Sequence, residues 1–214
     1  MSEPARPHDR FGAACVAFTL AAELLLGLAP EADRLTWALE NAPVWIGIVA
    51  WWLSRGRFRL SHLCLALFTV HALILMVGGH YTYAAVPLGD WVRDGLGLAR
   101  NPYDRLGHLA QGFVPALFAR ELFLRVARVP RSWWLPVLAV CAALAFSAFY
   151  ELVEWWTALL TGEAAEAFLG TQGDPWDTQW DMFLALVGAV SSLTLLSRAH
   201  DRSIDALGAG ALRR

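Results

Sequence analysis

Three short stretches of the sequence carry ionisable side chains at spacings that place them on one face of a helix. These are Asp104, Arg105 and His108; Glu151 and Glu154; and Asp177 and Asp181. An imidazole beside carboxylates can bind a divalent metal ion, and such an ion can activate water for hydrolysis. Without a metal ion, two close carboxylates can separate their pKa values and act as acid and base. The spacing therefore indicates a reactive polar site if the three stretches meet in space.

The residue types suggest a role for each member of this site. We expect the chemistry to be carried by four residues: His108, Glu151, Glu154 and Asp181. If a divalent metal ion is the cofactor, its expected ligands are His108, Glu151 and Asp181, although no H-E-x-x-H or C-x-x-C pattern supports a metal. Substrate binding is expected from a second set of polar residues: His80, Tyr83, Arg105, Gln172 and Asp177. Arg105 would pair with a phosphate or carboxylate of the substrate.

A structural explanation of the same residues stands beside this one. Buried ion pairs and hydrogen bonds also hold membrane helices together, and Arg105 with Glu151 or Asp181 could form such a lock. His71 lies in the middle of an apolar run and is expected to be a hydrogen-bonded packing residue. Cys64 is expected to pack as a small apolar side chain, and His200 is placed in a tail without a role.

The elements that must position these residues are membrane spans. The chain has 214 residues, of which 57% are hydrophobic and 17% charged, against about 25% charged in an average soluble domain. This composition excludes a disordered chain, and a net charge of -2 excludes a nucleic-acid-binding module. Six apolar runs approach the roughly 20 residues that a helix needs to cross a bilayer. They cover residues 11–28, 37–53, 60–79, 105–124, 133–160 and 180–196.

The sequence therefore predicts an all-α, polytopic membrane bundle of about six transmembrane helices. Residues 1–200 are expected to form one integral membrane domain, and residues 201–214 a disordered cytoplasmic tail. Six spans place both termini on one side, with all but four of the 17 arginines. The four on the other side are Arg34, Arg93, Arg100 and Arg105. Because cytoplasmic loops are rich in basic residues, both termini are predicted to be cytoplasmic, and the protein to lie in the inner (plasma) membrane.

The predicted topology brings the ionisable stretches to one depth. The starts of the fourth and sixth spans and the ends of the third and fifth all lie at the outer side, so we expect a polar pocket there. Glu23 and Glu40 belong to the same depth on the first two spans. The polar segment Glu163–Gln179 is expected to be a folded lid or pocket wall.

Several longer motifs at this side resemble a known family. They are Gly-Gly-His-Tyr-Thr-Tyr-Ala at 78–84, Asn-Pro-Tyr-Asp-Arg-Leu-Gly-His at 101–108, Phe-Tyr-Glu-Leu-Val-Glu-Trp at 149–155 and Gly-Thr-Gln-Gly-Asp-Pro-Trp-Asp-Thr-Gln-Trp-Asp-Met at 170–182. With these motifs, nearly the whole chain resembles the bacterial inner-membrane family typified by YjdF. That family has no established function, so the resemblance implies a location and a topology but no chemistry.

A weaker resemblance links the chain to VanZ-like membrane proteins, which are associated with lipoglycopeptide resistance. It rests on the following residues: Asp104, Arg105, His108, Glu151 and Asp181. The Asn that usually follows the last Asp in that group is absent here, where Ala185 and Leu186 stand.

Three classes of function remain open from the sequence. The first is a hydrolase or modifying enzyme for a lipid-linked envelope substrate, with membrane lipids as its other partners. The second is a transport protein, and the third a binding or accessory protein, in which the buried charges form a structural lock. No repeated halves of the kind found in many transporters occur, and the inner halves of the spans are nearly all apolar, which favours a pocket over a channel. The sequence leaves the oligomeric state open.

Overall fold

The structure is a computed structural model that describes residues 7–161 and 171–209. Within these residues the chain forms seven α-helices and one short 3-10 helix, with no β-strand. The elements are α1 (Pro7–Gly27), α2 (Arg34–Ser54), α3 (His62–Tyr81), η1 (Tyr83–Ala85), α4 (Pro87–Leu96), α5 (Tyr103–Arg125), α6 (Trp134–Thr161) and α8 (Asp177–Ala209). The predicted all-α class is confirmed, and each of the six apolar runs lies within one long helix or extends a residue or two beyond it.

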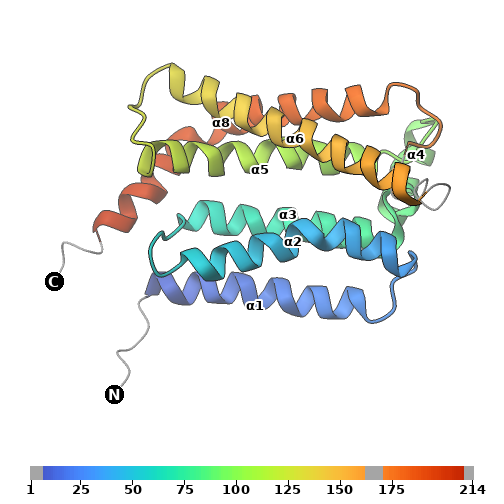
Figure 1. The fold of residues 1–214 in the computed structure, drawn as a ribbon, viewed down its shortest axis with the longest axis horizontal. Helices are drawn as coiled ribbons and strands as arrows, with labels where there is room; N and C mark the ends of the chain where they lie inside the picture. The colour runs from blue at the N-terminus through green and yellow to red at the C-terminus, as the bar shows by residue number, and fades with distance from the viewer. Residues whose placement is uncertain (1–6, 162–170, 210–214) are drawn as a thin grey trace.

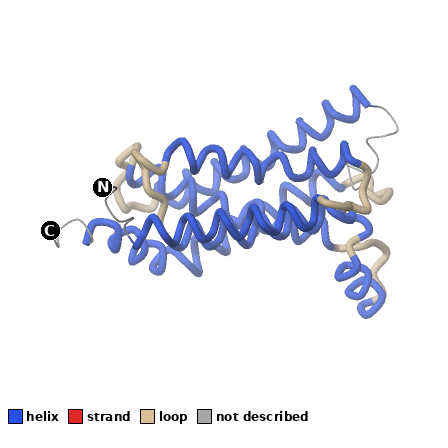
Figure 2. Tube along the Cα trace, turned by 90° about the horizontal axis from the view of Figure 1, so that it is seen from below, coloured by secondary structure: helices blue, strands red, loops and turns tan. Residues whose placement is uncertain are grey.

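The long helices form two groups that run along a common direction (Figure 1). Helices α1, α2 and α3 pack together on one side, and α5, α6 and α8 pack together on the other. Contacts from α3 to α5 and α8 join the two groups. Most of the loops lie at the two ends of the bundle (Figure 2). We call the end that carries α4 the outer end and the end from which α1 starts and where α8 stops the inner end, after the predicted orientation.

The surface of the bundle is apolar over most of its length, as a lipid environment requires. Leu25 on α1, Leu160 on α6 and Leu195 on α8 are 71%, 86% and 71% exposed. In a soluble protein such a continuous apolar surface would be a liability. Within the described part of the chain, four helices contain segments long and apolar enough to cross a membrane: Arg10–Gly27, His62–Tyr81, Trp134–Leu160 and Asp177–Leu207.

Helices α2 and α5 are long but contain more polar residues than these four. Helix α2 contains Glu40 and Asn41, and both side chains are buried against other helices. Helix α5 carries charged residues in its first and last turns and packs against α3, α6 and α8. A membrane helix can keep such polar groups against its neighbours, away from lipid. Six membrane crossings therefore remain a prediction, which these two helices fit by length and position.

Local sequence signals explain where the helices begin and approach one another. The Asp33 carboxylate caps α2 by accepting hydrogen bonds from the backbone N–H groups of Leu35 and Thr36 at 2.9 and 3.0 Å. Helices α5 and α8 touch backbone to backbone, since a Cβ atom on Gly112 or Gly188 would overlap a main-chain atom of the other helix. Small residues allow such close approach in membranes.

The C-terminal segment differs from the expected disordered tail. Helix α8 continues to Ala209, and residues 210–214 lie outside the described part of the chain. Asp201 pairs with Arg120 at 2.8 Å and with Arg131 at 3.2 Å, and Asp205 pairs with Arg131 at 3.4 Å. These ion pairs tie the last turns of α8 to the α5–α6 side of the bundle, so residues 201–209 continue the helix and contact the bundle.

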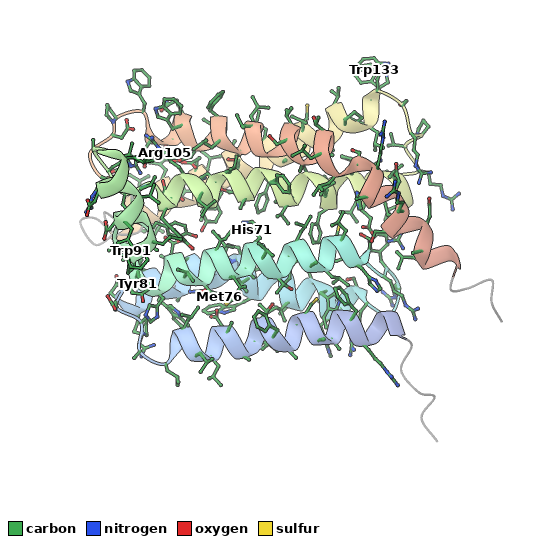
Figure 3. All side chains as sticks on the ribbon, turned by 180° about the vertical axis from the view of Figure 1, so that it is seen from behind. His71, Met76, Tyr81, Trp91, Arg105 and Trp133 are labelled. Atoms are coloured by element: carbon green, nitrogen blue, oxygen red, sulfur yellow. The ribbon has the colours of Figure 1, made fainter. Side chains whose placement is uncertain are left out.

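Two connections also differ from simple linkers. The stretch between α3 and α5 contains the ten-residue helix α4, whose Trp91 is 74% exposed at the outer end (Figure 3). Of the segment Glu163–Gln179, expected to be a lid or pocket wall, residues 163–170 lie outside the described residues. Residues 171–176 form turns, and Asp177 begins α8.

Candidate functional site

The three predicted stretches meet at the outer end of the bundle around His108. This residue on α5 is 6% exposed, Glu151 on α6 is 8% exposed and Asp181 on α8 is 3% exposed. The His108 Nε2 atom lies 3.4 Å from Asp104 Oδ1 and 3.7 Å from Asp181 Oδ1. On the opposite side of the ring, His108 Nδ1 lies 3.8 Å from Glu151 Oε1. We call these residues, together with Glu154, the outer cluster.

The outer cluster contains buried polar atoms without hydrogen-bond partners among the described residues. They are His108 Nδ1, Glu151 Oε1 and Asp181 Oδ1. The distances of 3.7 and 3.8 Å are longer than the usual 2.7–3.2 Å range for N–H···O bonds. Buried polar groups are normally paired, and an unpaired one costs free energy. Three such atoms lie in the outer cluster, so this cluster is not a fully paired network.

A separate set of contacts fixes the first turn of α5, which presents Asp104 and His108. Asn101 is completely buried, accepts a hydrogen bond from the Tyr103 N–H at 3.0 Å and donates to the Val86 carbonyl oxygen at 3.0 Å. The Asn101 N–H donates to Gln172 Oε1 at 2.9 Å, and Gln172 Nε2 donates back to the Asn101 carbonyl oxygen at 3.0 Å. Gln172, predicted to bind substrate, thus holds the segment before α8 against the start of α5.

Arg100 also lies at the outer end of the bundle, although the sequence analysis did not assign it to the site. Its guanidinium pairs with Asp177, with Asp104 Oδ2 at 3.3 Å and with Asp174 Oδ2 at 3.7 Å. Asp177, predicted as a substrate contact, is therefore 5% exposed and engaged in an ion pair. The sequence signal for this pair was weak, because Arg100 lies before the start of α5, outside the helix that carries Asp104.

Arg105 points away from the centre of the cluster. Its guanidinium lies 3.3 Å from Asp174 Oδ2 and 5.3 Å from the centre of the Trp180 ring, and its side chain is 36% exposed. The suggested lock between Arg105 and Glu151 or Asp181 is not the pairing that the structure shows. Figure 3 shows Arg105 near the outer end of the bundle.

His80 and Tyr83, the remaining predicted substrate residues, have different surroundings. His80 Nδ1 lies 2.7 Å from the carbonyl oxygen of Leu26 on α1, so His80 ties α3 to the α1–α2 turn. The Tyr83 ring lies between α3 and α5, because Cβ atoms on Gly78 and Gly107 would come within 2.5 and 2.9 Å of it. Tyr83 faces the interior, whereas His80 is not part of the outer cluster.

A cavity of about 450 Å³ opens beside the cluster. Its walls come from α2, α3, α5 and α6, and most of the lining is apolar. The polar lining residues are Glu40, His71, Tyr83, Asp104, His108, Gln111, Tyr150 and Glu154. His71, expected to be a hydrogen-bonded packing residue, lies halfway along α3 (Figure 3), and its buried Nε2 atom has no partner among the described residues. The cavity thus joins an apolar chamber to the acidic and imidazole groups of the outer cluster.

A second buried group of ionisable residues occupies the inner end. Its core consists of Cys64 on α3, Glu121 on α5 and His200 on α8, each 0% exposed. His200 Nε2 lies 3.0 Å from Glu121 Oε2 and 3.4 Å from Cys64 Sγ. Arg120 NH1 lies 3.2 Å from His200 Nδ1, while Glu121 also accepts from the Ser61 N–H at 2.9 Å and pairs with Arg125. We call this group, with its two arginines, the inner cluster.

Sequence reasoning missed the inner cluster because it placed His200 in a tail and assigned Cys64 to packing. The structure shows a complete network instead. Arginine can only donate hydrogen bonds, so His200 Nδ1 is the acceptor from Arg120 and the ring proton lies on Nε2, facing Glu121. Both ring nitrogens and both carboxylate oxygens are then paired. The usable signal was the position of Glu121, an acidic residue at an end rich in arginines.

Comparisons with known proteins agree with the expected family. Residues 12–202 match the model of the family described as predicted membrane protein, DUF2238. The chain is 51% identical over 176 residues to the inner membrane protein YjdF of Escherichia coli (strain K12), which covers 82% of this chain and 84% of that protein. No solved structure matches. The VanZ-like resemblance stays a prediction.

These matches cover nearly the whole bundle, including both clusters. They confirm the predicted family and the predicted location, so the chain is an integral protein of the inner membrane. The chain belongs to the DUF2238 family of predicted membrane proteins, the family of the E. coli inner membrane protein YjdF.

Proposed function

We propose that this protein is a membrane enzyme that hydrolyses or otherwise modifies a lipid-linked envelope substrate. The observation that carries the proposal is the junction of the cavity with the outer cluster: Asp104, His108 and Glu154 line the cavity and belong to the cluster. An apolar chamber that ends at a few convergent polar groups is the usual form of a small-molecule site. A volume of about 450 Å³ falls within the roughly 300–1,000 Å³ typical of such sites.

The cavity walls suit a substrate with a hydrocarbon chain. On the inner side of His108 the lining includes Phe68 on α3, Phe118 on α5 and Phe146 on α6. A lipid chain would bury apolar area there, while its polar group would reach His108. This apolar inner part also supports a pocket over a transport path, since a path would need polar groups across the inner leaflet.

The proposed chemistry uses the unpaired groups of the outer cluster. His108 would act as the base, or as a ligand of a metal ion, and Glu151, Glu154 and Asp181 as acids or ligands. Arg105 is partly exposed at the outer end but does not line the cavity, so it would have to leave its pair with Asp174 to meet an anionic group of the substrate. The alternative role, a structural lock in a binding or accessory protein, is better supported for the inner cluster, whose groups are all paired.

The proposal includes the topology, with six crossings and both termini in the cytoplasm. It is supported by the start of α1 and the end of α8, which lie at one end of the bundle (Figure 1), and by the 13 of 17 arginines that the predicted topology assigns to that side. The cavity's polar end then faces the outer leaflet. Reporter fusions after Gly97 and at the C-terminus test this orientation: only the first should be active in an export-dependent reporter, and the reverse pattern would contradict it.

The lipid-binding part is tested by filling the cavity. Ala42 and Ala50 lie on α2, but only Ala42 lines the cavity, whereas Ala50 is exposed. We expect Ala42→Phe to lose a co-purifying lipid that the wild type and Ala50→Phe retain, as measured by mass spectrometry of the detergent-purified proteins. The same lipid content in all three would contradict a lipid site in the cavity.

The enzymatic part is tested with the same proteins and total envelope lipids. The wild type should convert one lipid-linked species, detected by chromatography and mass spectrometry. His108→Ala should bind lipid without converting it. Conversion by His108→Ala at the wild-type rate would contradict the proposed role of the cluster.

A further inference from the structure

The two nitrogens of His108 face two different sets of carboxylates. Nε2 faces Asp104 and Asp181, and Nδ1 faces Glu151, which forms the second set with Glu154. In each set the imidazole and both carboxylates offer ligand atoms within 4.8 Å of one another. A neutral imidazole has one lone pair and one N–H, so it can ligate an ion on one side and donate a hydrogen bond on the other.

The distances favour an ion on the Nε2 side. Ligand atoms held at about 2.0–2.2 Å from Zn²⁺ in a tetrahedral site stand about 3.3 Å from each other. His108 Nε2 lies 3.4 Å from Asp104 Oδ1 and 3.7 Å from Asp181 Oδ1, which is close to that spacing. Asp181 Oδ1 is buried and has no hydrogen-bond partner among the described residues, so it is available as a ligand.

We infer that Asp104, His108 and Asp181 form a divalent-cation site of the outer cluster, with Glu151 orienting the imidazole from the other side. The assignment moves Glu151 out of the ligand set that its residue type suggested. A metal-bound histidine usually donates its second N–H to a carboxylate or carbonyl group, which fixes its tautomer. The unpaired His108 Nδ1 faces Glu151 Oε1 at 3.8 Å and is placed for this contact.

The surrounding charges support a cation at this position. Arg100 contacts Asp104 through Oδ2 at 3.3 Å, which leaves Oδ1 for the ion. Arg100 pairs with Asp104, Asp174 and Asp177. Among the described ion pairs, Asp181 has no arginine partner. A divalent ion would compensate the charge of Asp181, whose burial is costly without a partner.

The same site narrows the class of substrate, a step that rests on the proposed function. Three protein ligands leave one position of a tetrahedral ion open, as in catalytic zinc sites. Asp104 and His108 line the cavity and Asp181 does not, so the open position would meet the polar group of a bound lipid on the side of Asp104 and His108. The cavity lining holds three carboxylates, Glu40, Asp104 and Glu154, and no arginine. These carboxylates would repel an anionic group if no cation were bound. With the cation in place, the open position would accept a phosphate or carboxyl oxygen, so the substrate class is a lipid that carries one of these groups.

The experiment compares two matched variants, one from each set. Purified wild type, Asp181→Asn and Glu154→Gln are stripped with a chelator and dialysed against Zn²⁺, and bound zinc is measured by mass spectrometry. We expect about one ion per chain for wild type and Glu154→Gln, and at least tenfold weaker binding for Asp181→Asn. Both substitutions replace a carboxylate by an amide of the same size, and thermal unfolding confirms that each variant is folded.

Two results would overturn the inference. One is a folded wild type that binds no Zn²⁺ at micromolar concentrations. The other is zinc binding that Glu154→Gln abolishes and Asp181→Asn leaves intact, which would place the ion on the Nδ1 side. Stoichiometric zinc without any lipid in the cavity would contradict the proposed function but not the metal site. Bound lipid without zinc would contradict the metal site but not the lipid-binding part of the proposed function.

Discussion

The two ends of the bundle contain similar residues in different states. Each end brings a buried histidine and carboxylates together from helices α5 and α8, with a third helix beside them. At the inner end, both nitrogens of His200 and both oxygens of Glu121 have partners. At the outer end, His108 Nδ1, Glu151 Oε1 and Asp181 Oδ1 have none among the described residues. Only the outer cluster borders the cavity of about 450 Å³.

The comparison shows that residue type alone does not separate a structural lock from a site. Cys64, Glu121 and His200 could serve as metal ligands by type and proximity. The arginines distinguish the two clusters. In the inner cluster, Arg120 fixes the tautomer of His200, and Arg125 pairs with Glu121. In the outer cluster, Arg100 pairs with Asp104, Asp174 and Asp177 but not with Glu151 or Asp181. Completeness of hydrogen bonding is therefore the feature that distinguishes the two ends.

The largest expected effect on stability comes from breaking the inner cluster. Glu121→Ala leaves Arg125, His200 and the Ser61 N–H without their shared acceptor. Removing one partner of a buried ion pair costs about 3–5 kcal/mol, so the free energy of unfolding in detergent should fall by that amount. Asp205→Ala on the same end is the control, because its exposed pair with Arg131 is worth at most about 1 kcal/mol. Equal losses would show that the inner cluster is not a lock.

An intermediate loss of stability is expected when Arg100 is substituted, because its ion pairs hold the outer end together. Arg100→Ala leaves Asp104 and Asp177, which are 9% and 7% exposed at their side chains, without their cation. Hydrogen bonds to charged groups contribute about 1.5–3 kcal/mol, and denaturant unfolding should show a loss of this size. Arg93→Ala, whose partners Asp90 and Asp94 are exposed, should change stability by less than about 1 kcal/mol. A neutral Arg100→Ala would mean that Gln172 and Asn101 alone hold this end.

The smallest effect is expected at Asp33, a cap outside both clusters. Asp33→Ala should cost about 1 kcal/mol. Hydrogen bonds from Thr36 hold the pKa of the Asp33 carboxyl below its usual value, so its contribution is full above the pKa of the unfolded chain and is lost as the pH falls through the lower folded-state pKa. Unfolding of wild type and Asp33→Asn across that range should therefore converge at low pH. A difference that persists in acid would contradict the capping role.

The sequence predicted the long helices well, because each of the six apolar runs corresponds to one of them. It also predicted that His108, Glu151 and Asp181 meet, since helical spacing and alternating directions set their depth. It did not predict the intramolecular contacts of Gln172, Asp177 and His80, which were expected to bind substrate and which pair with Asn101, Arg100 and the Leu26 carbonyl group. The inner cluster was missed because the helix was expected to end near Leu196, before His200 could reach α5.

The two clusters can be compared most directly through the effect of Zn²⁺ on thermal unfolding of single variants. A ligand that binds the folded state at 100 times its dissociation constant stabilises it by about 2.7 kcal/mol. Zn²⁺ should raise the unfolding temperature of chelator-treated wild type and of Cys64→Ser, and should leave Asp181→Asn unchanged. A shift that Cys64→Ser abolishes and Asp181→Asn retains would contradict the assignment of the outer cluster as the site and the inner cluster as the lock.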